Sequence, residues 1–393
     1  MFSCEKLTEL RELNGLSRKE LAAQLNVSEQ AVWQYENEST IPRIEVLNKV
    51  RELFSVDTKF LFSKTFLNQT ASEERVAYRS KDRESRKKTK LELTYISYID
   101  YYISFFEKFL ITPDSAIAVL RNKATEMLRS DPDQSMDQSI TQTANLARKF
   151  LKLQNNKDLM YTLEMSGIYI AEKNLGPEID AYSTITDDGR PFIILGNIKK
   201  SAVRRNFDLA HELGHILLHT AIDMETLTKQ EHKQIEQQAN QFASVFLLPE
   251  EDFKRDFAEL PRHSNPDYYI EMKRKYMVSL VALAYRAYQL GLMTYQENRY
   301  FFGQLHKKGY QILEPLDDQM PPIRPGRVKS LLQLIFDKQI CSISDLESKF
   351  HIHPLFLTNL FGLDKDFFDH YMQQKKEYFD SAQVIPIRIN ERE

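Results

Sequence analysis

His211-Glu212-Leu213-Gly214-His215 is the stretch of this 393-residue sequence that says most about its fold. In a helix, positions i and i+4 lie on one face, so His211 and His215 can bind one metal ion together. Glu212 lies about 100° around the helix from His211, so its carboxylate can reach a water on that metal. Two imidazoles and a carboxylate at this spacing are typical of zinc peptidases. The stretch therefore predicts a zinc-binding helix with Glu212 as the general base.

A catalytic zinc site also needs a third protein ligand, beside one open position for water. His219 follows His215 by four residues, but it lies about 12 Å from His211 along a continuous helix. Three ligands on such a line cannot converge on one ion, and no glycine separates His215 from His219. We therefore interpret His219 as a histidine that packs or hydrogen-bonds beside the site.

Glu236 is the third ligand that we favour, in the stretch 235–249. Apolar residues recur there at helical spacing, and a proline ends the pattern. Two small alanines allow this second helix to approach the first closely. The ordinary interpretation of a lone glutamate is a solvated surface residue. Glu231 and His232 remain alternative ligands, in a polar stretch that we interpret as a connecting loop.

Three apolar segments before the zinc-binding helix predict strands. Residues 167–171 are apolar and β-branched, residues 181–185 alternate, and residues 192–195 follow the turn sequence 187–191. We expect a small antiparallel sheet beside the helix pair, as in zincins. An edge strand of that sheet can receive an extended substrate by strand addition.

Residues 1–62 form a separate module. Ser17 followed by Glu20 is a capping box at the start of one short helix, and Ser28 caps the next. Two short helices joined by a three- to four-residue turn are the signature of a helix-turn-helix. The second helix would lie in the DNA major groove with its first residues at base edges. We expect DNA contacts within residues 17–40, from Ser28, Glu29, Gln30, Trp33 and Gln34.

The charge of this module also allows a second interpretation, a helical module that binds protein. Residues 1–62 hold eight Lys and Arg against ten Asp and Glu, a net charge of −2. DNA-binding domains usually carry a basic surface. Residues 64–90 supply one, with nine basic and four acidic residues and a net charge of +5. We therefore favour DNA binding.

The two modules together resemble the ImmA/IrrE-type zinc metalloproteases that carry an N-terminal XRE-type helix-turn-helix. The resemblance covers residues 5–62 and 140–296. It rests on H-E-L-G-H with the following L-L-H, on E-x-x-A-N-x-F-A-x-x-x-L-x-P at 236–249, and on L-E-x-x-G-I at 163–168.

This resemblance implies a Zn²⁺ ion held by His211, His215 and Glu236, with Glu212 catalytic. It also implies an intracellular protein that cleaves or inactivates a partner transcription regulator. That protein substrate is commonly an XRE-type repressor, and the trigger is stress or DNA damage.

We divide the chain into a helix-turn-helix at 1–62, a charged linker at 63–90, a helical connector at 91–139, a zinc metallopeptidase domain at 140–296 and a helical C-terminal domain at 297–393. The predicted class is α+β, mainly α. Aromatic residues recur at helical spacing between 95 and 109, and we interpret them as core or as a dimer interface. In the last part, residues 344–350 and 354–360 predict another helix-turn-helix-like pair, in a region that would sense a signal or bind a partner.

Composition limits the cellular setting. Cys4 and Cys341 lie far apart, which argues against a disulfide framework and suits a reducing cytoplasm. The sequence has no secretion signal and no run of 18 apolar residues, so we expect no membrane association. A homodimer is one possible arrangement, since helix-turn-helix proteins often bind two half-sites.

The sequence thus predicts a cytoplasmic zinc endopeptidase that cleaves a regulator and is targeted by its own helix-turn-helix. Two alternatives stay open. One is a DNA-binding regulator whose metal is structural or sensory. The other is the toxin of a toxin–antitoxin or phage-defence pair.

Overall fold

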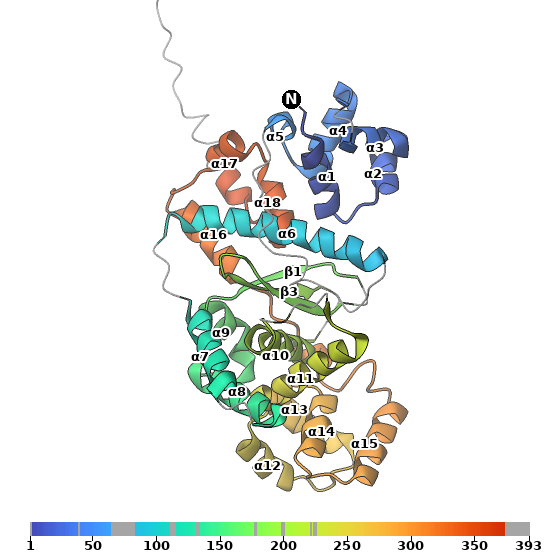
Figure 1. Cartoon of the computed structure of the whole chain (residues 1–393), viewed down its shortest axis with the longest axis vertical. Helices are drawn as coiled ribbons and strands as arrows, with labels where there is room; N and C mark the ends of the chain where they lie inside the picture. Colours follow the sequence, from blue (N-terminus) through green and yellow to red (C-terminus); the bar gives the residue numbers. More distant parts are fainter. Residues whose placement is uncertain are drawn as a thin grey trace, which may run out of the picture. The chain divides into compact units, whose positions relative to one another are not determined.

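The computed structural model describes residues 2–37, 40–63, 83–110, 115–130, 134–176, 179–197, 201–220, 222 and 226–373, with the backbone alone over 83–89. The described chain is mainly helical with one small sheet, which confirms the α+β, mainly α, class (Figure 1). No helix among the described residues is long and apolar enough to cross a membrane.

The chain folds into two compact units that do not follow the order of the sequence. Unit 1 comprises Met1–Leu67, Tyr98–Leu110 and Lys329–Glu393, and unit 2 comprises Asn68–Ser97 and Ile111–Val328. Most of the predicted linker 63–90 lies outside the described residues, from 64 to 82. Its last part begins the long helix α6 (Arg83–Glu107).

Unit 1 contains the predicted helix-turn-helix. Its helices are α1 (Cys4–Leu13), α2 (Arg18–Leu25), α3 (Glu29–Asn37), α4 (Ile44–Phe54) and α5 (Thr58–Phe62). The capping box forms as predicted, because Ser17 and Glu20 each accept a hydrogen bond from the backbone N–H of the other. The buried Glu36 of α3 binds Arg11 of α1 and Arg18 of α2, both at 2.5 Å, and so ties the three helices together.

The C-terminal part of unit 1 repeats this geometry. Its helices are α16 (Arg327–Asp337), α17 (Ile343–Phe350) and α18 (Pro354–Phe361). A left-handed residue and a cap two residues later join α17 to α18, at His351 and His353. Asn26 and Ser28 join α2 to α3 in the same way. The predicted second pair therefore forms, with both histidines in its turn.

The second pair differs from the first because α18 is buried. Phe356 of α18 packs on Phe60 of α5 and on Tyr98 of α6, with ring centroids 6.2 and 6.0 Å apart. The aromatic stripe of α6 is largely buried, as expected of core. The predicted region 297–393 is consequently divided. Its first part lies in unit 2, and the part from residue 329 belongs to unit 1. There the apolar side of α18 packs against α5 and α6.

Unit 2 contains the sheet, with strands β1 (Tyr169–Lys173), β2 (Ala181–Ile185) and β3 (Pro191–Gly196) in the order β1-β3-β2. The hairpin β2–β3 is antiparallel, but β1 pairs with β3 in parallel. The prediction of an antiparallel sheet is therefore wrong, and the sheet is mixed. The reason is that the chain after β1 passes to the far edge before the hairpin returns β3 to the middle.

Unit 2 also contains many of the helices in the described part of the chain. They are α7 (Ala116–Ser130), α8 (Met136–Phe150), α9 (Leu159–Met165), α10 (Ala202–Leu218), α11 (Lys229–Leu247), α12 (Glu250–Ala258), α13 (Ile270–Tyr276), α14 (Leu280–Gln289) and α15 (Tyr295–Lys307), with short 3-10 turns η2 (Asn156–Asp158), η4 (Pro266–Tyr269) and η5 (Asp317–Gln319). The apolar faces of α7 to α11 and α14 share one core with β1 and β3. This core positions α10 against α11 on one side and against β2 on another.

Unit 2 contains a buried cluster of charged side chains near the start of α10. The ammonium of Lys273 on α13 lies 2.7 Å from a carboxylate oxygen of Glu314 and 2.7 Å from one of Asp317. Lys273 has no solvent exposure, and the two acids are almost fully buried. Asp317 also accepts a hydrogen bond at 3.0 Å from the hydroxyl of Ser201, the residue that precedes α10. The cluster therefore connects the segment 314–317 to both α13 and the first turn of α10.

Candidate metal centre

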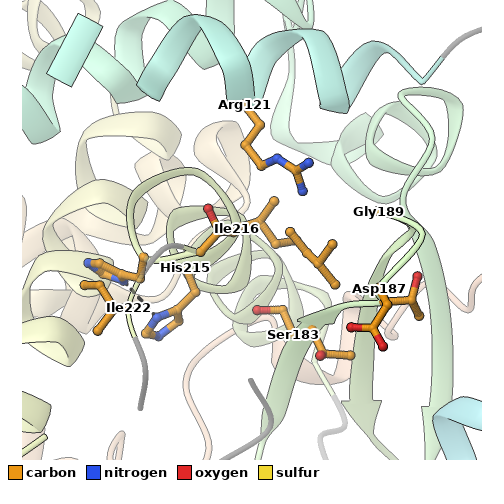
Figure 2. Close-up of a pocket in the computed structure, with 12 residues that line it drawn as sticks. Arg121, Ser183, Asp187, Gly189, His215, Ile216 and Ile222 are labelled. Atoms are coloured by element: carbon orange, nitrogen blue, oxygen red, sulfur yellow. Dashed lines mark hydrogen bonds between the residues drawn. The ribbon is translucent and has the colours of Figure 1, made fainter. Parts of the chain in front are cut away.

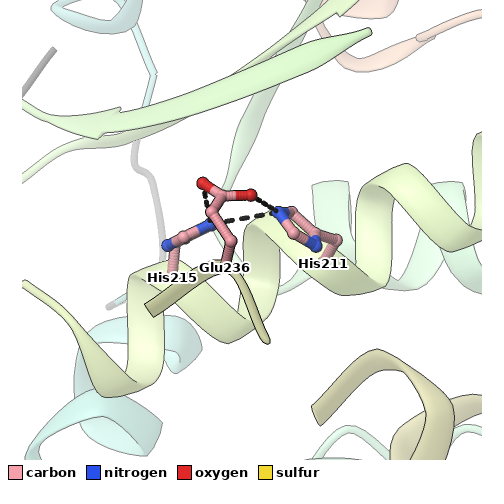
Figure 3. A group of neighbouring side chains, drawn as sticks. All are labelled: His211, His215 and Glu236. Carbon is pink, nitrogen blue, oxygen red and sulfur yellow. Dashed lines mark hydrogen bonds and ion pairs between the residues drawn. The ribbon is translucent and has the colours of Figure 1, made fainter. Parts of the chain in front are cut away.

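Two helices bring three potential metal ligands to one point. His211 and His215 lie on α10 and Glu236 lies on α11, and their ligand atoms are all within 4.8 Å of one another (Figure 3). The two Nε2 atoms are 3.1 Å apart. The Glu236 carboxylate lies 3.4 Å from Nε2 of His211 and 3.7 Å from Nε2 of His215. The structure thus brings together the three residues that the sequence singled out.

The outer side of the His211 ring is held by Asn240 of α11. Nδ1 of His211 lies 3.0 Å from the side-chain oxygen of Asn240. Because an amide oxygen only accepts hydrogen bonds, Nδ1 carries the proton in this contact. Nε2 of the neutral ring is then left with a lone pair, directed at His215 and Glu236. Two nitrogen lone pairs and a carboxylate that face one another suit a cation.

Glu212 lies against the sheet. It is 6% exposed, and the hydroxyl of Ser183 on β2 donates a hydrogen bond of 2.6 Å to its carboxylate. Burial raises the pKa of Glu212 to about 7, although His211 and the Ser183 hydroxyl both favour the charged form. A carboxyl group with such a pKa can accept and return a proton near neutral pH.

A pocket of about 340 Å³ lies beside these residues, along β2. It extends from His215, one of the three potential ligands, past the end of α10, and Figure 2 shows Arg121 of α7 pointing toward it. Its lining includes Ser183, Ile185 and Asp187 from β2 and the following turn, and His215, Ile216 and His219 from α10 and its cap. Within the described residues, β2 is an edge strand of the sheet, so this pocket lies beside the edge of the sheet.

His219 lies outside the group of potential ligands, as predicted. It follows the last residue of α10 and is 4% exposed. Its Nδ1 is 3.0 Å from Nδ1 of His215, and its Nε2 is 2.9 Å from the side-chain oxygen of Gln238. Burial lowers the pKa of His219 to about 4, so this imidazole stays neutral.

The alternative ligands Glu231 and His232 do not join the group. The stretch that we interpreted as a loop is the first turn of α11, and this correction has a local cause. Thr228 and Glu231 form a capping box that starts the helix. The Glu231 carboxylate is held at this cap and is unsuited to a metal ligand.

The proposed DNA-contacting residues lie on and beside α3. Ser28, Glu29, Gln30 and Trp33 are exposed, and Gln34 is half-buried. The Ser28 hydroxyl accepts a hydrogen bond of 3.1 Å from the backbone N–H of Ala31, so it caps the helix. The other four residues lie on α3.

Sequence reasoning did not single out Ser183, Gln238 and Asn240 as site residues. Asn240 had a usable signal, because it lies four residues beyond Glu236 and therefore shares its helical face. Ser183 and Gln238 had none, because their contacts join elements that are distant in the sequence.

The close approach of α10 and α11 depends on Gly214. A Cβ atom added there would lie 3.0 to 3.3 Å from side-chain carbons of Phe242 on α11. We expect Gly214→Val to lower the free energy of unfolding by about 1–3 kcal/mol through overpacking. Gly303→Val is the matched control, because Gly303 lies in α15 with nothing within 4 Å of the added Cβ. Denaturant unfolding measures both, and equal stability of the two variants would contradict the close contact.

Models of known protein families match two parts of the chain, the helix-turn-helix and the region of the candidate metal centre. Residues 163–288 match the model described as IrrE N-terminal-like domain, Peptidase_M78, and residues 7–61 match the helix-turn-helix model HTH_3. The two matches lie at the positions of the two modules, and neither covers half of the chain. The range that matches the IrrE N-terminal-like model includes β1 to β3, α10 and α11, and so all residues of the candidate metal centre.

Comparison with whole proteins gives no further support to the match with the IrrE N-terminal-like model. No curated protein matches the chain. Among solved structures, one match is Bacillus thuringiensis PlcR, crystallised in complex with the peptide PapR7 and DNA. It has 11% sequence identity and a TM-score of 0.15, over 97% of this chain and 99% of that chain. A TM-score this low carries no argument about fold or function.

Proposed function

We propose that this chain is a zinc-dependent endopeptidase, linked to a DNA-binding domain, that cleaves a partner transcription regulator in a stress or defence response. The observation that carries the proposal is the meeting of His211, His215 and Glu236 beside the buried carboxylate of Glu212. The IrrE N-terminal-like match supports a peptidase at the level of the family.

The donor set fits zinc. Two imidazole nitrogens and one carboxylate are the ligands of catalytic zinc sites, which keep a fourth position open. Among the described residues, no further histidine, cysteine or acid joins the group. This pattern favours a catalytic over a closed structural site. Zn²⁺ bound there would supply Lewis acidity, which lowers the pKa of a coordinated water and polarises a substrate carbonyl.

The surrounding residues fit the remaining tasks of peptide hydrolysis. As an edge strand among the described residues, β2 can receive an extended peptide by strand addition, with a side chain in the adjacent pocket. Ser183 orients the carboxylate of Glu212. Glu212 then takes a proton from the attacking water and passes it to the nitrogen of the leaving amine.

We further propose that α3 reads DNA through Gln30 and Gln34. A double variant Gln30→Ala/Gln34→Ala is expected to weaken sequence-specific binding by about 1–3 kcal/mol for each bidentate contact that is lost. Fluorescence anisotropy on a site selected from random DNA measures this loss. Gln296→Ala, exposed on α15 and outside the predicted DNA-binding range 17–40, is the control. If all these proteins bind the selected site equally, α3 is not the reading helix.

The function is tested by mapping new protein termini in cells that express the wild type or Glu212→Gln, at rest and under DNA-damaging stress. One regulator that gains a new terminus only with the wild type would identify the substrate and support the endopeptidase. Identical termini in both cultures would overturn it and favour a DNA-binding regulator with a sensory metal. Growth arrest on expression of the wild type alone would favour a toxin.

A further inference from the structure

His219 occupies a central position between the two helices of the metal centre. It caps α10 and is nearly fully buried, although its side chain is polar. Its two ring nitrogens contact different partners, His215 on one side and Gln238 of α11 on the other. The proposed reaction assigns no task to either His219 or Gln238.

The hydrogen-bond directions along this chain of side chains follow from the metal-binding state of His215. To offer the Nε2 lone pair to a metal, a neutral His215 must carry its proton on Nδ1. That N–H lies 3.0 Å from Nδ1 of His219, which must therefore accept and carry no proton. The proton of His219 is then on Nε2, where the oxygen of Gln238 accepts it at 2.9 Å. Each donor meets an acceptor throughout.

The same helix holds the other ligand histidine in a simpler way. The side-chain oxygen of Asn240 accepts directly from Nδ1 of His211. For each ligand histidine, α11 therefore supplies the amide oxygen that ends the hydrogen-bond chain, directly for His211 and through His219 for His215. This second contact, independent of His219, indicates that α11 has a general role in orienting the two rings.

We propose that His219 and Gln238 are positioning residues that fix the tautomer and ring plane of His215 and so strengthen metal binding. The inference rests on the proposed function, because it takes the zinc site as given. Outer partners of ligand histidines are usually carboxylates, carbonyl oxygens or water, and their loss typically costs 10- to 100-fold in metal affinity. In this protein the outer partner of His215 is a second imidazole, that of His219.

The test measures Zn²⁺ affinity by competition with a chromophoric chelator in the full-length protein. His219→Ala is expected to weaken Zn²⁺ binding by about 10- to 100-fold, and Gln238→Ala by a smaller factor in the same direction. His219→Asn is expected to recover most of the affinity, because its amide oxygen can lie near the position of Nδ1. His306→Ala, an exposed histidine variant on α15, is the control and should match the wild type.

A second readout reports the tautomer of His215 directly. In ¹⁵N NMR spectra of the metal-free protein, wild-type His215 is expected to carry its proton on Nδ1, and His219→Ala is expected to mix the two tautomers. If His219→Ala does not fold, Gln238→Ala is measured in its place, since Gln238 is only half-buried.

Four outcomes overturn the inference. Affinity of His219→Ala within about twofold of the wild type would remove the positioning role, whose expected loss is larger. Equal losses in the alanine and asparagine variants would assign His219 to packing alone. X-ray absorption that shows one nitrogen fewer around zinc in His219→Ala would make it a ligand. A wild type that binds no Zn²⁺ would instead remove the proposed zinc site itself, so the two failures are distinguishable.

Discussion

Glu212→Gln is expected to lower peptide hydrolysis by about 10²- to 10⁴-fold while Zn²⁺ binds as tightly as to the wild type. This range is typical for the loss of a general acid–base group. Glutamine has nearly the same shape as glutamate, and its amide oxygen can still accept the hydrogen bond from Ser183. It cannot accept a proton from water at neutral pH. Catalysis and metal binding should therefore separate in this one variant.

The measurement pairs turnover of the mapped substrate with zinc content of the same preparation. Glu251→Gln, an exposed change of the same kind on α12, is the matched control and should keep full activity. Full activity of Glu212→Gln would remove this carboxylate from the mechanism. Loss of zinc together with activity would instead make Glu212 part of the metal site.

Lys273→Ala is expected to destabilise unit 2 by about 3–5 kcal/mol, the usual cost of removing one partner from a buried ion pair. Two carboxylates, of Glu314 and Asp317, would remain buried without their counter-charge. Because Asp317 also holds Ser201 at the start of α10, the loss should reach the helix that carries His211 and His215.

Denaturant unfolding followed by far-UV circular dichroism measures this loss, and Arg274→Ala provides the control. Arg274 is on the same helix and pairs with Glu271, but the two side chains are 55% and 75% exposed. Exposed pairs contribute at most about 1 kcal/mol. The triple variant Lys273→Met/Glu314→Gln/Asp317→Asn is expected to recover part of the stability, because no buried charge is left. If Lys273→Ala lowers the free energy of unfolding by less than about 1 kcal/mol, the charged groups of this cluster are in contact with water and not buried.

Local sequence rules were enough to predict the strands and the three potential ligands. Helical spacing placed His211 and His215 on one face, and the pattern after Glu236 predicted the helix that presents it. The start of that helix was also predictable, because Thr228 and Glu231 have the spacing of a capping box. We interpreted this stretch as a loop, although the capping signal is visible in the sequence.

The remaining differences come from contacts between distant segments. Nothing near β1 in the sequence shows that it pairs in parallel with β3, because strand order depends on where the chain returns. Ser183 and Gln238 meet the site only once β2 and α11 pack on α10. In the same way, the sequence predicted the helix at 354–360, but not that Phe60 and Tyr98 would pack against it.

The construction of unit 1 from both ends of the described chain also sets an order of events during synthesis. The residues of unit 2 have all left the ribosome once Val328 has emerged, and that unit can fold while translation continues. Unit 1 is completed later, because α17 and α18 follow the residues of unit 2 in the sequence. Until then Phe60 and Tyr98 lack the cover that Phe356 supplies. A prematurely terminated product would therefore display an apolar surface beside its helix-turn-helix, a feature by which chaperones and proteases can recognise incomplete chains.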